Sequence, residues 1–133
     1  MLFFNGLEQW GLLTLRISLG VIFAYHAIPK LKMPGAMAKG IGWLSGFVII
    51  LGLVEFFSSL AVILGVYTEV GAFFLGVVML GALYYKIFKW KIPFYVMDKT
   101  GWEFDLILLG ASITLLFTGA GTISLDALIG VWP

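Results

Sequence analysis

The chain has 133 residues, of which 62% are hydrophobic and 11% are charged, and its formal net charge is +1. Soluble domains usually carry about 25% charged residues, so this composition predicts a single integral membrane domain over residues 1–133 and excludes a nucleic-acid-binding surface. The chain has no cysteine and one histidine, which excludes iron–sulfur ligation, Cys-based zinc sites and bis-histidine haem ligation within one chain.

The first half of the sequence predicts two membrane-spanning helices. The first covers about residues 10–28 and is expected to end before Pro29, because proline disrupts a helix interior. A loop with two prolines follows. The second helix covers residues 41–64, an apolar run whose only charged residue is Glu55. At about 1.5 Å per residue this run is long enough to cross a bilayer core of roughly 30 Å.

The second half predicts two further helices, at about 69–85 and 102–118. Thr68 is in position to cap the first of them, and residues 100–103 (TGWE) have the spacing of a capping box. The segment GAGTISLD, residues 119–126, contains flexible glycines and is expected to turn the chain out of the last helix. Ser124 would then cap a short helix, and Trp132 would anchor the tail at the membrane interface.

The lysines predict the orientation. All seven lie in the loops after the first and third predicted helices, and the other connecting segments contain no lysine or arginine. By the positive-inside rule both termini face the non-cytoplasmic side. The predicted fold is therefore all-α, a four-helix bundle that crosses the cell membrane several times and has the lipid bilayer as its surroundings.

Two charged residues lie within predicted spans, and a charge at membrane depth needs a partner or a function. Arg16 and Glu55 lie about 9 and 13 Å from the outer ends of their predicted helices. We therefore predict an intramembrane ion pair between Arg16 and Glu55. This pair either fixes the register of the two helices or contributes to a binding or protonation site.

Other polar residues cluster near the predicted cytoplasmic end. Lys30 and Glu103 could meet there, although Lys30 could equally reach lipid headgroups and Glu103 could cap its own helix. Tyr25 and His26 are candidates, with Arg16 and Glu55, for contact with a substrate or quinone, although a histidine in this position is often structural. No Glu-x-x-His spacing exists, so no metal site is expected.

The ordered set of these residues resembles the DoxX family of small four-helix membrane proteins. The resemblance covers nearly the whole chain and is most specific in the GxGxxSLD-like ending. It rests on these residues: Arg16, Gly20, Lys30, Glu55, Leu64, Gly65, Thr68, Glu103, Gly119, Gly121, Ser124, Leu125 and Asp126. Ala27 stands where the family usually has glycine. The resemblance implies a subunit role near membrane redox chemistry, as in the membrane component of thiosulfate:quinone oxidoreductase.

Three functions remain open from the sequence. The first is a membrane subunit of a quinone-linked oxidoreductase or respiratory-type complex, with Arg16 and Glu55 contributing to a quinone site. The second is a structural or assembly subunit of a larger complex, and the third is a lipid-binding, small-molecule-binding or transport module. The sequence predicts no intrinsic cofactor and no catalysis by the chain alone, so a larger complex or a homo-oligomer is expected.

Overall fold

The protein is built from helices joined by short connections. The computed structural model describes residues 4–131, and no β-strand occurs among them. The long helices in this range are α1 (Glu8–Lys32), α3 (Ser45–Leu64), α4 (Thr68–Tyr84) and α5 (Trp102–Thr118). Three stretches, Glu8–Lys32, Ser45–Leu64 and Thr68–Lys89, are long and apolar enough to cross a membrane. α5 has 17 residues, at the short end of the range for a spanning helix.

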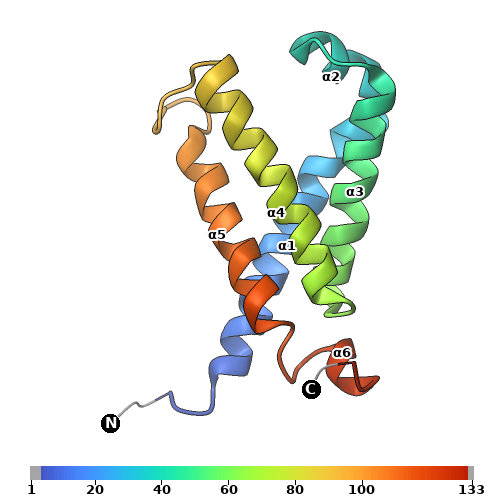
Figure 1. The fold of residues 1–133 in the computed structure, drawn as a ribbon, viewed down its shortest axis with the longest axis vertical. Helices are drawn as coiled ribbons and strands as arrows, with labels where there is room; N and C mark the ends of the chain where they lie inside the picture. Colours follow the sequence, from blue (N-terminus) through green and yellow to red (C-terminus); the bar gives the residue numbers. More distant parts are fainter. Residues whose placement is uncertain (1–3, 132–133) are drawn as a thin grey trace.

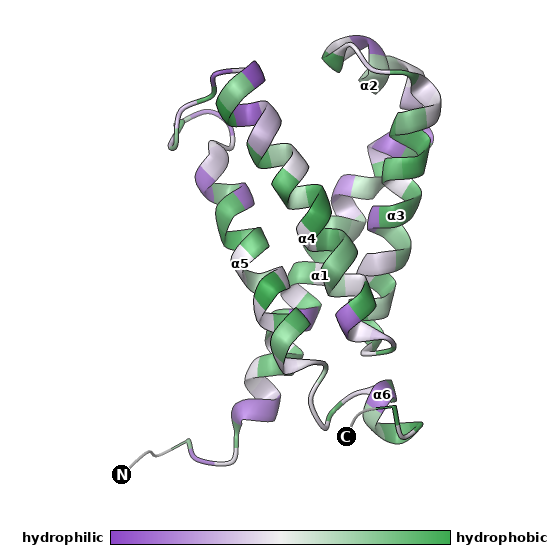
Figure 2. Ribbon diagram, viewed as in Figure 1, coloured by the Kyte–Doolittle hydropathy of each residue, from purple (hydrophilic) through white to green (hydrophobic). Residues whose placement is uncertain are grey.

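The long helices pack as two pairs. α1 lies along α3, α4 lies along α5, and α3 packs against α4 to join the pairs. Figure 1 shows the pairs close together near the chain termini and diverging toward α2 (Pro34–Ile41) and the π-helical turn η1 (Tyr85–Lys89). Figure 2 shows mostly apolar helices, with hydrophilic residues near α2 and η1 and also at the start of α1 and in α6. All seven lysines lie at the end of α1, in α2, in η1 or in the connection after η1. The end where the pairs diverge is therefore also the lysine-rich end.

Helix α1 is longer than predicted at both ends. It begins at Glu8 and continues through Pro29 to Lys32, so the predicted end at residue 28 is wrong. Pro29 has no backbone N–H, so the carbonyl of Tyr25 loses its usual intrahelical donor. This loss is tolerated because it falls in the last turn of the helix. The amide of Met33 closes that turn by donating to the carbonyl of Pro29 at 2.9 Å. The extra turn places Lys30 on the helix rather than in a loop.

The predicted loop between the first two spans contains a helix of its own. α2 starts with Pro34 at its first position, where a missing N–H is harmless. It ends at Gly42, whose φ of 75° is left-handed, a conformation that glycine adopts without strain. This stop delays the start of α3 to Ser45, four residues later than predicted.

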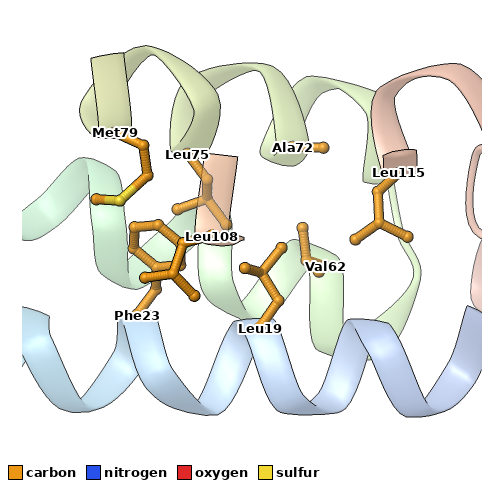
Figure 3. Close-up of a cluster of buried hydrophobic side chains, with 8 residues drawn as sticks. All are labelled: Leu19, Phe23, Val62, Ala72, Leu75, Met79, Leu108 and Leu115. Atoms are coloured by element: carbon orange, nitrogen blue, oxygen red, sulfur yellow. The ribbon is translucent and has the colours of Figure 1, made fainter. Parts of the chain in front are cut away.

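The hydrophobic core lies where all four long helices meet. It consists of these buried side chains: Leu19, Phe23, Val62, Ala72, Leu75, Met79, Leu108 and Leu115 (Figure 3). Gly20 lets α1 approach α3 closely, because a Cβ there would clash with the Ile63 side chain and lie 2.9 Å from the Ser59 carbonyl. The polar centres described below lie on either side of this core.

The GAGTISLD segment turns the chain as predicted. α5 ends at Thr118, and Gly119 and Gly121 follow with φ values of 68° and 79°. A short helix, α6 (Leu125–Leu128), begins after Ser124, whose side chain accepts a hydrogen bond from the amide of Ala127 at 3.1 Å. Trp132 lies outside the described residues, so its anchoring role stays a prediction.

Two predicted caps do not form. Thr68 is the first residue of α4, and its buried hydroxyl has no hydrogen-bond partner among residues 4–131. The capping box at TGWE is absent, because Gly101 occupies the N-cap position of α5 and the Thr100 hydroxyl lies 3.3 Å from Lys86 Nζ. The start of α4 is stabilised from elsewhere in the chain.

Candidate functional site

The first buried polar centre surrounds Arg16, near the chain termini. Only 1% of Arg16 is exposed. Its Nε donates to the carbonyl of Val62 at 2.9 Å, and its Nη2 donates to the carbonyl of Ile63 at 3.0 Å, both in the last turn of α3. The guanidinium thus binds the end of α3, where helix carbonyls lack intrahelical donors and the dipole favours a cation.

The same guanidinium also binds the C-terminal segment. Arg16 Nη1 donates to the carbonyls of Ala120 and Ile123 at 2.8 and 2.7 Å. The planar fork of arginine suits this arrangement, because its donors diverge toward two different segments. Arg16 therefore ties together α1, α3 and the segment after α5.

Asp126 completes this centre from the other side. Its carboxylate accepts hydrogen bonds from the amides of Tyr67 and Thr68 at 2.7 and 3.1 Å, and its own amide donates to the carbonyl of Gly65 at 2.7 Å. Asp126, which is 5% exposed, is thus the cap of α4 that was predicted at Thr68. A carboxylate at a helix N-terminus satisfies free amides and complements the dipole.

The predicted ion pair between Arg16 and Glu55 does not form. Arg16 lies level with Val62 and Ile63, about two helical turns from Glu55 along α3. The prediction compared the depths of Arg16 and Glu55 on the assumption that the outer ends of their helices lie in one plane. In the structure, α1 extends well beyond α3 at this end (Figure 1). Arg16 reaches enough carbonyl oxygens to be satisfied without a carboxylate.

The second polar centre joins Glu55 to Lys30. Lys30 Nζ lies 2.7 Å from Glu55 Oε2, and the side chains of Lys30 and Glu55 are 16% and 3% exposed. Lys30 also donates to the carbonyl of His26 at 3.1 Å, one turn back along α1. Helical side chains lean toward the N-terminus, so the lysine ammonium reaches the level of Glu55.

A third pair was missed by the sequence reasoning. Lys86 in η1 forms an ion pair with Asp105 on α5, and both side chains are largely buried. Neither residue was among the candidates taken from the sequence. The wider π-helical turn carries Lys86, and such turns often occur at functional sites. A signal for this pair was present in the sequence: Lys86 directly follows one predicted helix, and Asp105 lies in the first turn of the next.

The expected contact between Lys30 and Glu103 is not observed, because Glu55 takes the lysine. Glu103 Oε2 has no hydrogen-bond partner among the described residues. His26 is exposed and lies beside Tyr25 and Phe104, with ring centroids 6.3 and 6.1 Å away. The structure thus joins Lys30 to Glu55 and to the backbone carbonyl of His26, and it separates this centre from Arg16.

The profile of the DoxX family matches residues 11–90. This match covers more than half of the chain and includes Arg16, Lys30 and Glu55. The chain belongs to the DoxX family. Several motif residues of this DoxX chain fall into the first two centres: Arg16, Gly65 and Asp126 lie in the first, and Lys30 and Glu55 form the second.

Two relatives of this DoxX chain are similar over most of their length. A protein of Haemophilus influenzae described as "Uncharacterized protein" is 30% identical over 127 residues, which is 92% of this chain and 95% of the relative. "Putative oxidoreductase CatD" of Bacillus subtilis is 30% identical over 122 residues, which is 90% of this chain and 87% of the relative. No solved structure matches the chain significantly.

Proposed function

We propose that this DoxX chain is a membrane subunit of a quinone-linked oxidoreductase complex, and that the quinone head group binds beside Lys30, Glu55 and His26. Family membership and the similarity to a relative named as an oxidoreductase support a redox setting. The observation that carries the proposal is the Lys30–Glu55 pair, a donor and a carboxylate 2.7 Å apart at membrane depth. Charged residues within membrane spans are expensive and usually functional.

The chemistry of these residues fits a quinone. Lys30 and His26 can donate hydrogen bonds to quinone carbonyls, and Glu55 can pass protons to the reduced head group. Tyr25 is 74% exposed and lies next to His26, which offers an aromatic surface on the side that faces the surroundings. The electrons come from a partner subunit, because the chain has no cysteine and only one histidine with which to hold a redox centre.

The proposal includes the membrane arrangement. α5 spans the cell membrane together with the three longer helices, so the domain is a four-helix bundle. Both termini then face the non-cytoplasmic side, as the distribution of the lysines favours. The chain assembles with larger membrane subunits or with itself through its exposed apolar faces.

The second candidate function is a structural or assembly subunit without a bound substrate. The observation that favours it is Arg16, whose guanidinium donates four hydrogen bonds to backbone carbonyls of its own chain. A charge used in this way stabilises the fold. The two candidates differ in what they require of Glu55 and His26, so the experiment addresses those residues.

The test is a titration of the chain, purified alone in lipid nanodiscs, with a short-chain ubiquinone analogue followed by tryptophan fluorescence. We expect saturable quenching that weakens at least tenfold in Glu55→Gln and in His26→Asn. Glu69→Gln serves as the control, because Glu69 is an exposed acid in the first turn of α4 and belongs to none of the polar centres. His26 is exposed, so its replacement should not disturb folding.

Two outcomes would contradict the proposal. Quenching that rises linearly, or that is equal in all variants, would indicate partition into lipid and favour the structural subunit. A visible chromophore on the isolated chain, or quinone reduction by it with thiosulfate or another small donor, would show an enzyme rather than a subunit.

A further inference from the structure

A cavity at the lysine-rich end is separate from all three polar centres. It has a volume of about 600 Å³ and lies between α2 and the start of α3. Small residues of α2, among them Gly35, form much of its wall, together with Lys39, Trp43 and Ser45. Among residues 4–131, no carboxylate lines it. The cavity therefore combines a cation and a hydroxyl with an aromatic wall.

The charge of Lys39 is not neutralised within the described part of the chain. Lys30 and Lys86 form ion pairs with Glu55 and Asp105, whereas Lys39 forms none among residues 4–131. Lysine is a strongly hydrated point charge that binds phosphate groups well. The counter-ion that suits the cavity is therefore an external anion.

The walls of the cavity are shaped and held in place. The Ser45 hydroxyl faces Gly35 across the space, 4.0 Å from where a Cβ of Gly35 would lie. The Trp43 ring is fixed between Phe47 and Tyr85, with centroid distances of 5.1 and 4.9 Å. A group entering the cavity meets the lysine and the hydroxyl without displacing a side chain of the core.

The surroundings of the cavity are apolar. Leu44 and Phe47 are 81% and 52% exposed and flank Ser45 in the sequence, so acyl chains have a surface beside the polar cavity. Basic pockets at the cytoplasmic end of spanning helices commonly bind anionic headgroups. We propose that this cavity binds the phosphate headgroup of an anionic phospholipid, with its acyl chains along Leu44 and Phe47.

The test measures lipid binding to the full chain in a neutral detergent, by native mass spectrometry and by thermal stabilisation. Phosphatidylglycerol and phosphatidylcholine with identical acyl chains are compared, and inorganic phosphate is titrated separately. We expect phosphatidylglycerol to bind more tightly than phosphatidylcholine. Lys39→Gln should weaken phosphatidylglycerol binding about fivefold, which corresponds to about 1 kcal/mol for one lysine at an anionic surface.

The variants separate the cavity from general electrostatics. Gly35→Leu should fill the cavity and weaken binding without a change in charge, and Ser45→Ala, at an exposed position, should also weaken it. Lys32→Gln is the matched control, because Lys32 is an exposed lysine near the end of α1 that does not line the cavity.

Three results would overturn the proposal. Equal loss in Lys32→Gln and Lys39→Gln would indicate diffuse attraction to lipid. Equal affinity for the two lipids would exclude an anionic headgroup site. Stabilisation by inorganic phosphate that matches and competes with phosphatidylglycerol would identify free phosphate, rather than lipid, as the occupant.

Discussion

Lys30 and Glu55 neutralise each other where little water reaches them. Removing one partner leaves an unpaired buried charge, at a cost of roughly 3–5 kcal/mol. We expect Lys30→Met and Glu55→Leu each to lower the free energy of unfolding by roughly 3–5 kcal/mol. The double variant should lower the free energy of unfolding by less than either single variant. Thermal unfolding in detergent measures this, with the exposed Lys32→Met as control. A double variant no more stable than the worse single variant would contradict the pairing.

The sequence predicts which charged residues lie within the apolar helices, but it does not predict their hydrogen-bond and ion-pair partners. Arg16 and Glu55 stand out because a charge in an apolar run is rare, whereas Lys30 lies beyond the predicted end of the first span. Pairing depends on how far one helix slides past its neighbour, and this stagger leaves no local signal. The interpretation that joined Arg16 to Glu55 lacked the stagger that places Arg16 beside Val62 and Ile63, and it lacked the carbonyls of Ala120 and Ile123.

Helix α4 begins at a cap contributed by a residue 58 positions later, Asp126. Thr68→Val removes a buried hydroxyl without a hydrogen-bond partner among the described residues, so we expect unchanged stability or a gain of up to about 1 kcal/mol. Asp126→Asn loses the charge and one acceptor and should cost about 1–2 kcal/mol. Thermal unfolding and hydrogen exchange at Tyr67 and Thr68 check both. A loss in Thr68→Val larger than that in Asp126→Asn would restore Thr68 as the cap.

The long apolar helices could be predicted from the sequence, but α2 could not. Runs of apolar residues bounded by glycine define α3 and α5 in the sequence, and their ends at Leu64 and Thr118 agree with the structure. α2 is short and carries two glycines inside it, features typical of loops. Its helix is supported by Pro34 at the start and by packing against α1 and α3, which local preference does not reveal.

Because all seven lysines lie at one end of the molecule, we predict that the whole chain inserts into the membrane in a single orientation. A reporter that is active only outside the cytoplasm should be active when fused after Pro133 and inactive when inserted at Met97, an exposed position in the lysine-rich connection after η1. The reason is that lysine-rich loops stay on the cytoplasmic side. The reverse pattern would contradict the proposed topology, and a reporter active at both sites would indicate mixed insertion.

The contacts of Arg16 also set an order of events during synthesis. Arg16 enters the membrane with the first helix, but the carbonyl of Ala120 is made 104 residues later. At about 5–20 residues per second, that interval is roughly 5–20 s. The guanidinium lacks all four of its final acceptors until Val62 and Ile63 are made, and it then lacks two of the four until the tail is made. Over this interval it must rely on water, lipid phosphate or an insertion factor. A ribosome that stops before this tail would release a chain whose first helix still holds an unsatisfied cation, a feature that membrane proteases and chaperones can recognise.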